Sequence, residues 1–130
     1  MQLIVDGHHL APETVTVARR AAPGRLALVT DAVAAAAAPD GEYPIGPTRI
    51  RAANGIVRDD DGRLAGSALT MIEAVRSLHA LGAPLEEALS AASTIPARIA
   101  DRPDLGRLQL GAPADIVVLD DRLEIQGVLT

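Results

Sequence analysis

Residues 3–31 read LIVDGHHLAPETVTVARRAAPGRLALVTD, and this stretch decides the fold. Leu3–Val5 and Leu26–Val29 are short runs that are apolar throughout, which is typical of parallel strands covered on both faces. Between them, Pro12 favours the first position of a helix, and Pro23-Gly24 ends that helix. A strand, a helix and a strand at this spacing predict a βαβ unit, and therefore an α/β fold.

The next part of the chain, residues 45–64, predicts a small antiparallel meander. Its short β-like runs are divided by Asn54-Gly55 and Asp61-Gly62, and these dipeptides are the two that most favour tight hairpins. We therefore expect a β-hairpin insertion at about residues 42–66.

Helices and then strands are predicted for the rest of the chain. Thr70 and Glu73 have the spacing of a capping box, and apolar residues repeat every three positions as far as Leu81, which predicts an amphipathic helix. A second helix follows Pro84, and a third starts near Pro96. The tail predicts three strands, at residues 107–110, 115–119 and 123–129.

Size and composition limit the possible functions. A chain of 130 residues with a net charge of −5 and a single aromatic residue, Tyr43, has no basic cluster and little on which bases could stack, so no nucleic-acid partner is expected. Its longest apolar run, residues 32–38, is far shorter than the ~20 residues of a membrane span, and no signal peptide is recognised. We expect a cytoplasmic protein with no membrane partner.

Asp31 is the sharpest catalytic candidate. It follows an apolar parallel strand at its C-terminal end, where α/β folds place ligands and catalytic groups. A carboxylate at this position can take a proton from an attacking water and return it to a leaving amine. The alternative is that Asp31 only turns the chain after the strand, as aspartate often does.

A second group of candidates, Asp6-Gly7-His8-His9, follows the other predicted strand, so both segments could face one pocket. Adjacent histidines suggest a metal, but neighbours in an extended segment point to opposite faces, so the dipeptide is a poor pair of ligands. One histidine could contact a substrate while the other packs or meets water. Structural histidines are an equally good interpretation.

Leu64-Ala65-Gly66-Ser67 precedes the capped helix. Small residues allow close approach of a backbone, and the first amides of a helix attract anions. The pattern is weak, because Gly-Ser before a helix is mostly typical of capping.

Taken together, these segments resemble the N-acetylglucosamine-6-phosphate deacetylases, in which similar segments occur in this order and spacing. The segments are Asp6–His9, Val29–Ala32, Asn54-Gly55 and Leu64–Met71. The tail, residues 105–117, resembles the closing segment of the wider amidohydrolase superfamily. The resemblance covers nearly the whole chain.

The resemblance implies a (β/α)8 barrel with a small β-sandwich built from both chain ends. Such a barrel needs about 250 residues, so this chain would supply only its C-terminal part. Residues 1–104 would be the last βα units with the hairpin insertion at about 42–66. Residues 105–130 would be the C-terminal strands of the sandwich.

By the same resemblance, Asp31 matches the family's catalytic aspartate. The substrate-binding residues would be Asp6, Gly7, His8, His9, Leu64, Ala65 and Gly66. The reaction implied is metal-assisted hydrolysis of N-acetylglucosamine 6-phosphate to glucosamine 6-phosphate and acetate. A divalent cation, zinc or iron, would activate the water.

The chain departs from the family in one respect. The family's metal ligands, one glutamate and two histidines, lie upstream of the first matching motif, and so does an arginine from a partner subunit that binds the phosphate. No metal ligand is therefore expected in this chain, and the complete enzyme is expected to be a homo-oligomer, a dimer. Two alternatives remain: another amidohydrolase, acting on a cyclic amide or an N-acyl amino acid, or a non-catalytic fragment.

Overall fold

The computed structural model describes all residues 1–130, and its centre is the predicted βαβ unit. Strand β1 (Gln2–Leu3) pairs in parallel with β2 (Ala27–Leu28), with Leu3 opposite Leu28. Helix α1 (Pro12–Ala21) joins the two strands and begins with its proline, as predicted. Both strands are shorter than predicted, and the backbone hydrogen bonds beside the pair are Ala27 N to Met1 O (2.8 Å) and Val29 N to Leu3 O (3.0 Å).

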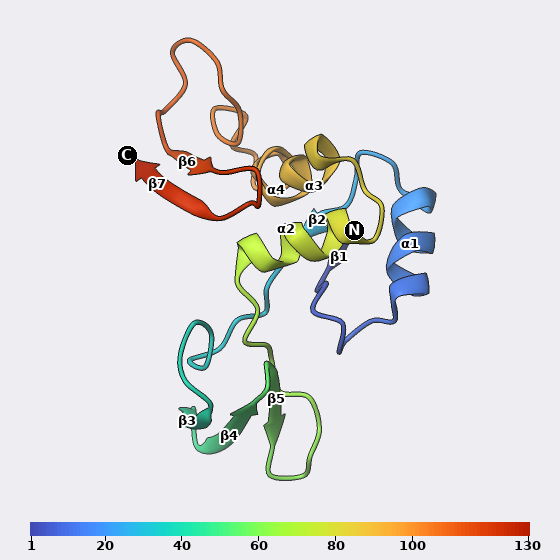
Figure 1. Cartoon of the computed structure of the whole chain (residues 1–130), viewed down its shortest axis with the longest axis vertical. Coiled ribbons are helices and arrows are strands. Elements are labelled where there is room, and N and C mark those ends of the chain that lie inside the picture. Colours follow the sequence, from blue (N-terminus) through green and yellow to red (C-terminus); the bar gives the residue numbers. More distant parts are fainter.

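Three further helices form the rest of the body (Figure 1): α2 (Met71–Ala80), α3 (Leu85–Ala92) and α4 (Thr94–Ile99). All three contact β2. The predicted capping box of α2 is confirmed, since Thr70 and Glu73 each bond the backbone N–H of the other. Helix α4 starts two residues earlier than predicted, and Pro96 lies within it.

The main core lies between the parallel strands and the helices. It consists of eleven buried residues contributed by β2, α1, α2, α3 and the segments that flank them. They are Val5, Val15, Leu26, Leu28, Leu69, Ala74, Val75, Leu78, Ala83, Ala88 and Ala91.

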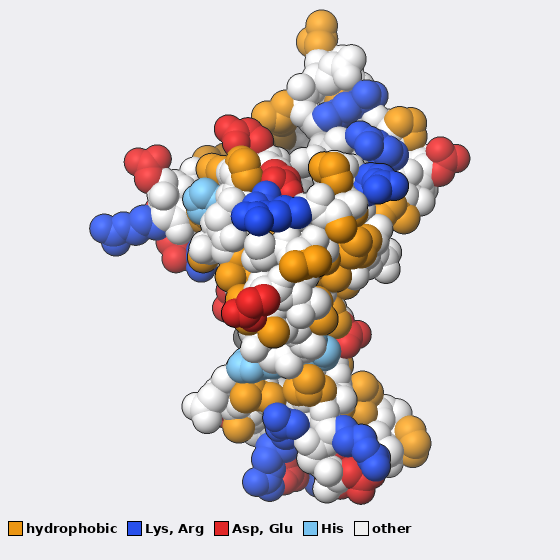
Figure 2. Space-filling model, turned by 90° about the vertical axis from the view of Figure 1, so that its right-hand side faces the viewer, with side chains coloured by type: hydrophobic (Ala, Val, Ile, Leu, Met, Phe, Trp, Pro, Cys, Tyr) orange, Lys and Arg blue, Asp and Glu red, His pale blue; other side chains and the backbone are white.

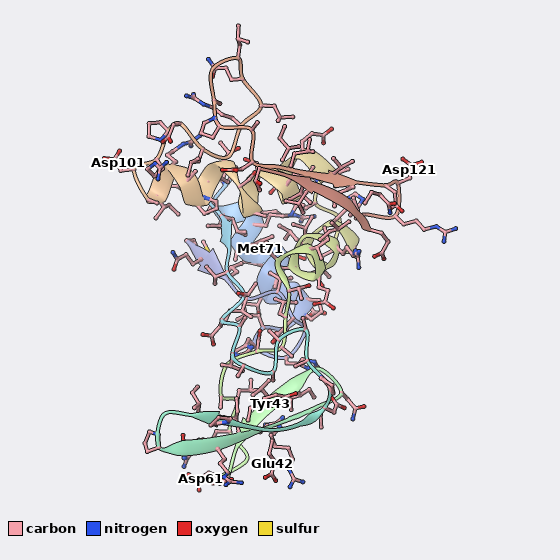
Figure 3. The ribbon with its side chains drawn as sticks, turned by 90° about the vertical axis from the view of Figure 1, so that its left-hand side faces the viewer. Glu42, Tyr43, Asp61, Met71, Asp101 and Asp121 are labelled. Atoms are coloured by element: carbon pink, nitrogen blue, oxygen red, sulfur yellow. The ribbon has the colours of Figure 1, made fainter.

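The predicted meander forms a separate three-stranded sheet, β3 (Gly41–Ile45), β4 (Thr48–Ala53) and β5 (Ile56–Asp59), antiparallel and in that order. Figure 1 shows it apart from the helical body, joined to it by two connecting segments. The sheet has a small core of its own, Ala35, Ile50, Ala52 and Val57. Tyr43 packs against that core, and Glu42 lies on the opposite face (Figure 3).

The chain ends in an antiparallel hairpin of β6 (Ile116–Leu119) and β7 (Ile125–Leu129). Arg76 of α2 holds this hairpin to the body, because its Nη2 donates to the Leu123 carbonyl (2.6 Å) and pairs with the Glu124 carboxylate (2.9 Å). None of the helices α1 to α4 has the length and apolar character that a membrane-spanning helix requires.

The strand predicted at residues 107–110 is wrong, and this segment is irregular instead. Gly106 is the cause: it has a positive φ (+69°) and packs against the backbone of Ser93. The Thr94 hydroxyl also donates to the Gly106 carbonyl (2.5 Å). The segment is therefore pinned to the junction of α3 and α4, and Leu110 is left fully exposed.

Leu78 offers a direct test of the core. Its side chain is 1% exposed, so Leu78→Ala should lower the free energy of unfolding by ~2–5 kcal/mol through lost burial and a residual cavity. The matched control is Leu110→Ala, which should change it by less than about 0.5 kcal/mol because that side chain is in solvent. Urea denaturation followed by circular dichroism measures both; equal losses would contradict the core described here.

Candidate functional site

The candidate residues lie at one edge of the β1–β2 pair. Leu3 and Leu28 are partners in the parallel register, and Asp6 and Asp31 each come three positions later in the sequence. The carboxyl ends of neighbouring parallel strands point to the same edge. The structure therefore brings the two predicted segments to one side of the fold.

Asp6 organises the first segment. One of its oxygens, Oδ1, accepts the backbone N–H of His8 and of His9, both at 2.9 Å, and the other, Oδ2, lies 2.7 Å from His9 Nδ1. Burial disfavours the charged carboxylate, but these hydrogen bonds from His9 and His8 outweigh it and hold the pKa of Asp6 below its usual value. Asp6 is therefore an ionised anchor of the loop.

The two histidines differ in exposure, although their segment is bent rather than extended as the sequence predicted. The His9 side chain is only 20% exposed and is held by Asp6, which is itself 7% exposed. His8 is exposed, and its side chain makes no hydrogen bond. Gly7 is exposed and has a positive φ of 78°, so the turn after β1 uses the freedom of glycine.

Asp31 lies where the first connecting segment leaves the body. Its backbone is left-handed (φ 51°), which is uncommon for a residue other than glycine and costs about 1 kcal/mol or more. Its side chain is exposed and makes no hydrogen bond. The side-chain acceptor in this turn is Thr30, whose hydroxyl lies 3.4 Å from the N–H of Ala32. The carboxylate of Asp31 is thus not used to turn the chain.

Ser67 fixes the backbone on both sides of Asp31. Its N–H donates to the Asp31 carbonyl (2.8 Å), and its own carbonyl accepts from Val33 N (3.1 Å). Its hydroxyl donates to the Thr30 carbonyl (2.5 Å), and the side chain is buried. The two connecting segments are therefore bridged at the waist of the molecule, where Figure 2 shows histidine side chains at the surface.

Leu64, Ala65 and Gly66 lie in the second connecting segment, and all three are half-buried. Gly66 has φ +83°, and a Cβ built on it would lie 2.4 Å from Val33 Cγ1 and 3.1 Å from the Asp31 carbonyl oxygen. The segment passes so close to the Val33 side chain that a Cβ at this position does not fit, and it also lies beside the Asp31 carbonyl. Two of the predicted site segments, Asp31 and residues 64–66, are thus in direct contact.

The sequence interpretation missed the role of Ser67. The Gly66-Ser67 pattern is typical of a helix cap, but the cap of α2 is Thr70. Ser67 accepts from Leu69 N (3.0 Å) instead and is the only polar residue of the chain that is buried as a whole, backbone included. A serine beside a run of small apolar residues could have indicated a buried hydrogen bond, although the spacing of the sequence does not predict its partner.

The residues present do not fit a metal centre. No group of three or more His, Asp or Glu side chains lies close enough to hold an ion. His79, the remaining histidine, lies 2.7 Å through Nδ1 from the Ala83 carbonyl at the end of α2. A catalytic cation usually has about three protein ligands, so this chain by itself does not provide a catalytic metal site.

Comparison with known proteins places these features in context. The sequence model of the Amidohydrolase family matches residues 3–129. The N-acetylglucosamine-6-phosphate deacetylase of Vibrio furnissii is 36% identical over 97% of this chain, which spans 32% of that relative. The N-acetylgalactosamine-6-phosphate deacetylase of Escherichia coli is 38% identical over 98% of the chain and 34% of the relative.

A solved structure matches the fold as well. It is the N-acetyl-D-glucosamine-6-phosphate deacetylase of Mycobacterium smegmatis, as an aspartate-to-alanine variant in complex with N-acetyl-D-glucosamine 6-phosphate. The TM-score is 0.86 at 38% identity, over 98% of this chain and 35% of that one. The chain spans about a third of the length of these relatives.

Proposed function

The chain belongs to the amidohydrolase family, and on this premise we propose that it is the C-terminal part of an N-acetylglucosamine-6-phosphate deacetylase. The proposed reaction converts N-acetylglucosamine 6-phosphate and water to glucosamine 6-phosphate and acetate. Relatives that carry this name are 36–41% identical over nearly the whole chain. The N-acetylgalactosamine epimer is the second candidate substrate, because a similarly close relative is named for it.

The fold is that of the C-terminal part of the family's (β/α)8 barrel. We divide it into residues 1–104, the last βα units with the inserted sheet, and residues 105–130, the strands of a β-sandwich. This division is supported by the separate β6–β7 hairpin, which contacts the body through Arg76. From the sequence we also keep the expectation of a cytoplasmic homo-oligomer.

The observation that carries the proposal is the exposed carboxylate of Asp31, which has no hydrogen bond and whose backbone is held by Ser67. In the proposed reaction, water attacks the acetyl carbonyl carbon and Asp31 takes its proton. The C–N bond then breaks, and Asp31 delivers that proton to the amine nitrogen. Transfer in both directions suits a carboxylate that is not committed to another partner.

Binding of the amino sugar is assigned to the two segments beside Asp31. His9, fixed by Asp6, would contact the substrate, with Gly7 and His8 completing the loop. The backbone of Leu64, Ala65 and Gly66 would line the sugar pocket, which is supported by the close approach of Gly66 to Asp31.

Deacetylases of the amidohydrolase family are generally metal-dependent. The side chains of this chain do not form a metal site. We therefore place the ligands of the catalytic metal ion in residues outside these 130. Zinc or iron remains the expectation from the resemblance.

A chimera tests the proposal. This chain replaces the matching third of the M. smegmatis deacetylase, to which it is 38% identical. The chimera should release acetate from N-acetylglucosamine 6-phosphate, whereas the isolated chain should release none. Assay of the galactosamine epimer, a cyclic amide and an N-acyl amino acid in parallel separates the alternatives. A folded chimera that hydrolyses neither N-acetylglucosamine 6-phosphate nor its galactosamine epimer would refute the proposal.

His9 and His8 should differ in their contribution to catalysis. Only His9 is anchored and partly buried, so His9→Ala in the chimera should reduce kcat/KM by about tenfold or more, the loss of a substrate hydrogen bond. His8→Ala should have a smaller effect, because its side chain points to solvent. Steady-state kinetics measures both, and an equal or reversed order would reject the assignment.

A further inference from the structure

Both carboxylate oxygens of Asp6 have hydrogen-bond partners, and the partner of Oδ2 is the imidazole ring of His9. Oδ1 is used by two backbone N–H groups, so the contact of Oδ2 with His9 Nδ1, at 2.7 Å, is the one that concerns the ring. The side chain of Asp6 is 7% exposed and that of His9 is 20% exposed. Both side chains are therefore held in place, and the contact is shielded from most of the solvent.

The direction of this hydrogen bond follows from the charge of Asp6. Two backbone N–H groups, of His8 and His9, donate to Asp6 and favour its ionised form, and an ionised carboxylate only accepts hydrogen bonds. The proton between the two groups must then belong to Nδ1. A neutral imidazole has a single N–H, and the partner of one ring nitrogen decides the state of the other. Nε2 therefore carries a lone pair.

The other ring nitrogen is available. His9 Nε2 has no hydrogen-bond partner in the chain, and it is not among the buried polar atoms that lack one, so it reaches solvent. It lies on the segment that shares its sheet edge with Asp31.

We propose that Asp6 is a positioning residue that fixes His9 as the Nδ1–H tautomer, so that Nε2 accepts a hydrogen bond from an O–H or N–H donor of the ligand. The kinetic part of this inference rests on the proposed function, since an amino sugar offers ring hydroxyls and an amide N–H. The tautomer itself does not rest on it. A histidine fixed as the Nε2–H tautomer would instead donate a hydrogen bond from Nε2, and its partner in the ligand would be a carbonyl or phosphate oxygen.

The tautomer is measured on the isolated chain by long-range ¹H–¹⁵N NMR of the imidazole nitrogens in alkaline buffer. The His9 signals are assigned by their loss in His9→Gln. We expect a protonated Nδ1 and an unprotonated Nε2. A ring protonated at Nε2, or an averaged mixture of the two forms, would overturn the inference.

Asp6→Asn reverses the hydrogen bond without removing it. The amide oxygen can keep the two backbone contacts, while the amide nitrogen donates to Nδ1, so the proton moves to Nε2 and the two nitrogen shifts exchange. The matched control is Asp59→Asn, because Asp59 Oδ1 also accepts two backbone N–H groups, from Asp61 and Arg63, in a turn without histidine. It should leave the His9 signals unchanged.

In the chimera, Asp6→Asn should lower kcat/KM by at least about tenfold, since one acceptor has become a donor. Asp6→Glu, which keeps the charged acceptor, should recover part of the loss. Unchanged kinetics in Asp6→Asn, with the tautomer exchanged, would overturn the role of Nε2 as an acceptor. A parent chimera that is inactive on both amino sugars would instead count against the proposed function, and the NMR result decides the tautomer independently.

Discussion

In the chimera, Asp31→Asn is expected to lower kcat by a factor of at least ~100, the usual scale for loss of a general acid–base group. Asparagine has the same shape, and the Asp31 side chain makes no hydrogen bond that would be lost. The folded structure and the metal content should therefore be unchanged. What is removed is the ability to take a proton from water and to return it to the amine nitrogen.

The control for this experiment is Asp121→Asn. Asp121 is also exposed, and it lies in the turn between β6 and β7, away from the waist (Figure 3). The Asp121→Asn variant loses the same charge as Asp31→Asn and should retain the kcat of the parent chimera. Steady-state kinetics, elemental analysis and thermal unfolding of both variants separate a chemical effect from a structural one. Near-normal turnover of Asp31→Asn would remove Asp31 from the mechanism.

Local sequence signals predicted most of the helices. Pro12, the Thr70–Glu73 capping box and the break at Pro84 act on neighbouring residues, so their effect is visible in the sequence, and α1, α2 and α3 begin where these signals stand. The hairpin turn at Asn54-Gly55 is equally local, and it joins β4 to β5 as predicted.

The errors arose where distant residues decide the structure. Residues 107–110, Arg-Leu-Gln-Leu, alternate between polar and apolar side chains as a strand does, but no neighbouring strand pairs with them. Gly106 docks them on the backbone of Ser93 and Thr94 instead. Such a contact depends on where α3 and α4 lie, and the pattern of side chains in the tail does not predict their position.

The candidate site was partly predictable for the same reason. Asp31 and Asp6 follow apolar strands, and parallel pairing was enough to place them on one edge. The hydrogen bonds that give these residues their roles were not predictable. The tie of Ser67 to Thr30 spans 37 positions, and the anchoring of His9 by Asp6 depends on the path of a turn.

Gly66→Ala should have the second large effect. A methyl group at this position would be 2.4 Å from Val33 Cγ1, whereas carbon atoms in contact are about 3.5–4.0 Å apart. Something must therefore move by about 1 Å. Val33 is β-branched and stiff at χ1, and its backbone is bonded to Ser67 (3.1 Å). The displacement should pass to the segment that includes Asp31.

A shift of this size in a catalytic group can cost about 100-fold in rate, so we expect Gly66→Ala to lower kcat/KM of the chimera by roughly that factor. Gly111→Ala is the matched control, because Gly111 has nearly the same φ (+85° against +83°) and open space around its Cβ position. Both variants incur the same backbone strain of about 1 kcal/mol. Only Gly66→Ala adds the contact with Val33, so the difference between the two in steady-state kinetics measures the effect of that contact on Asp31. If the two variants lose the same small amount of activity, the close approach of Gly66 does not position the catalytic aspartate.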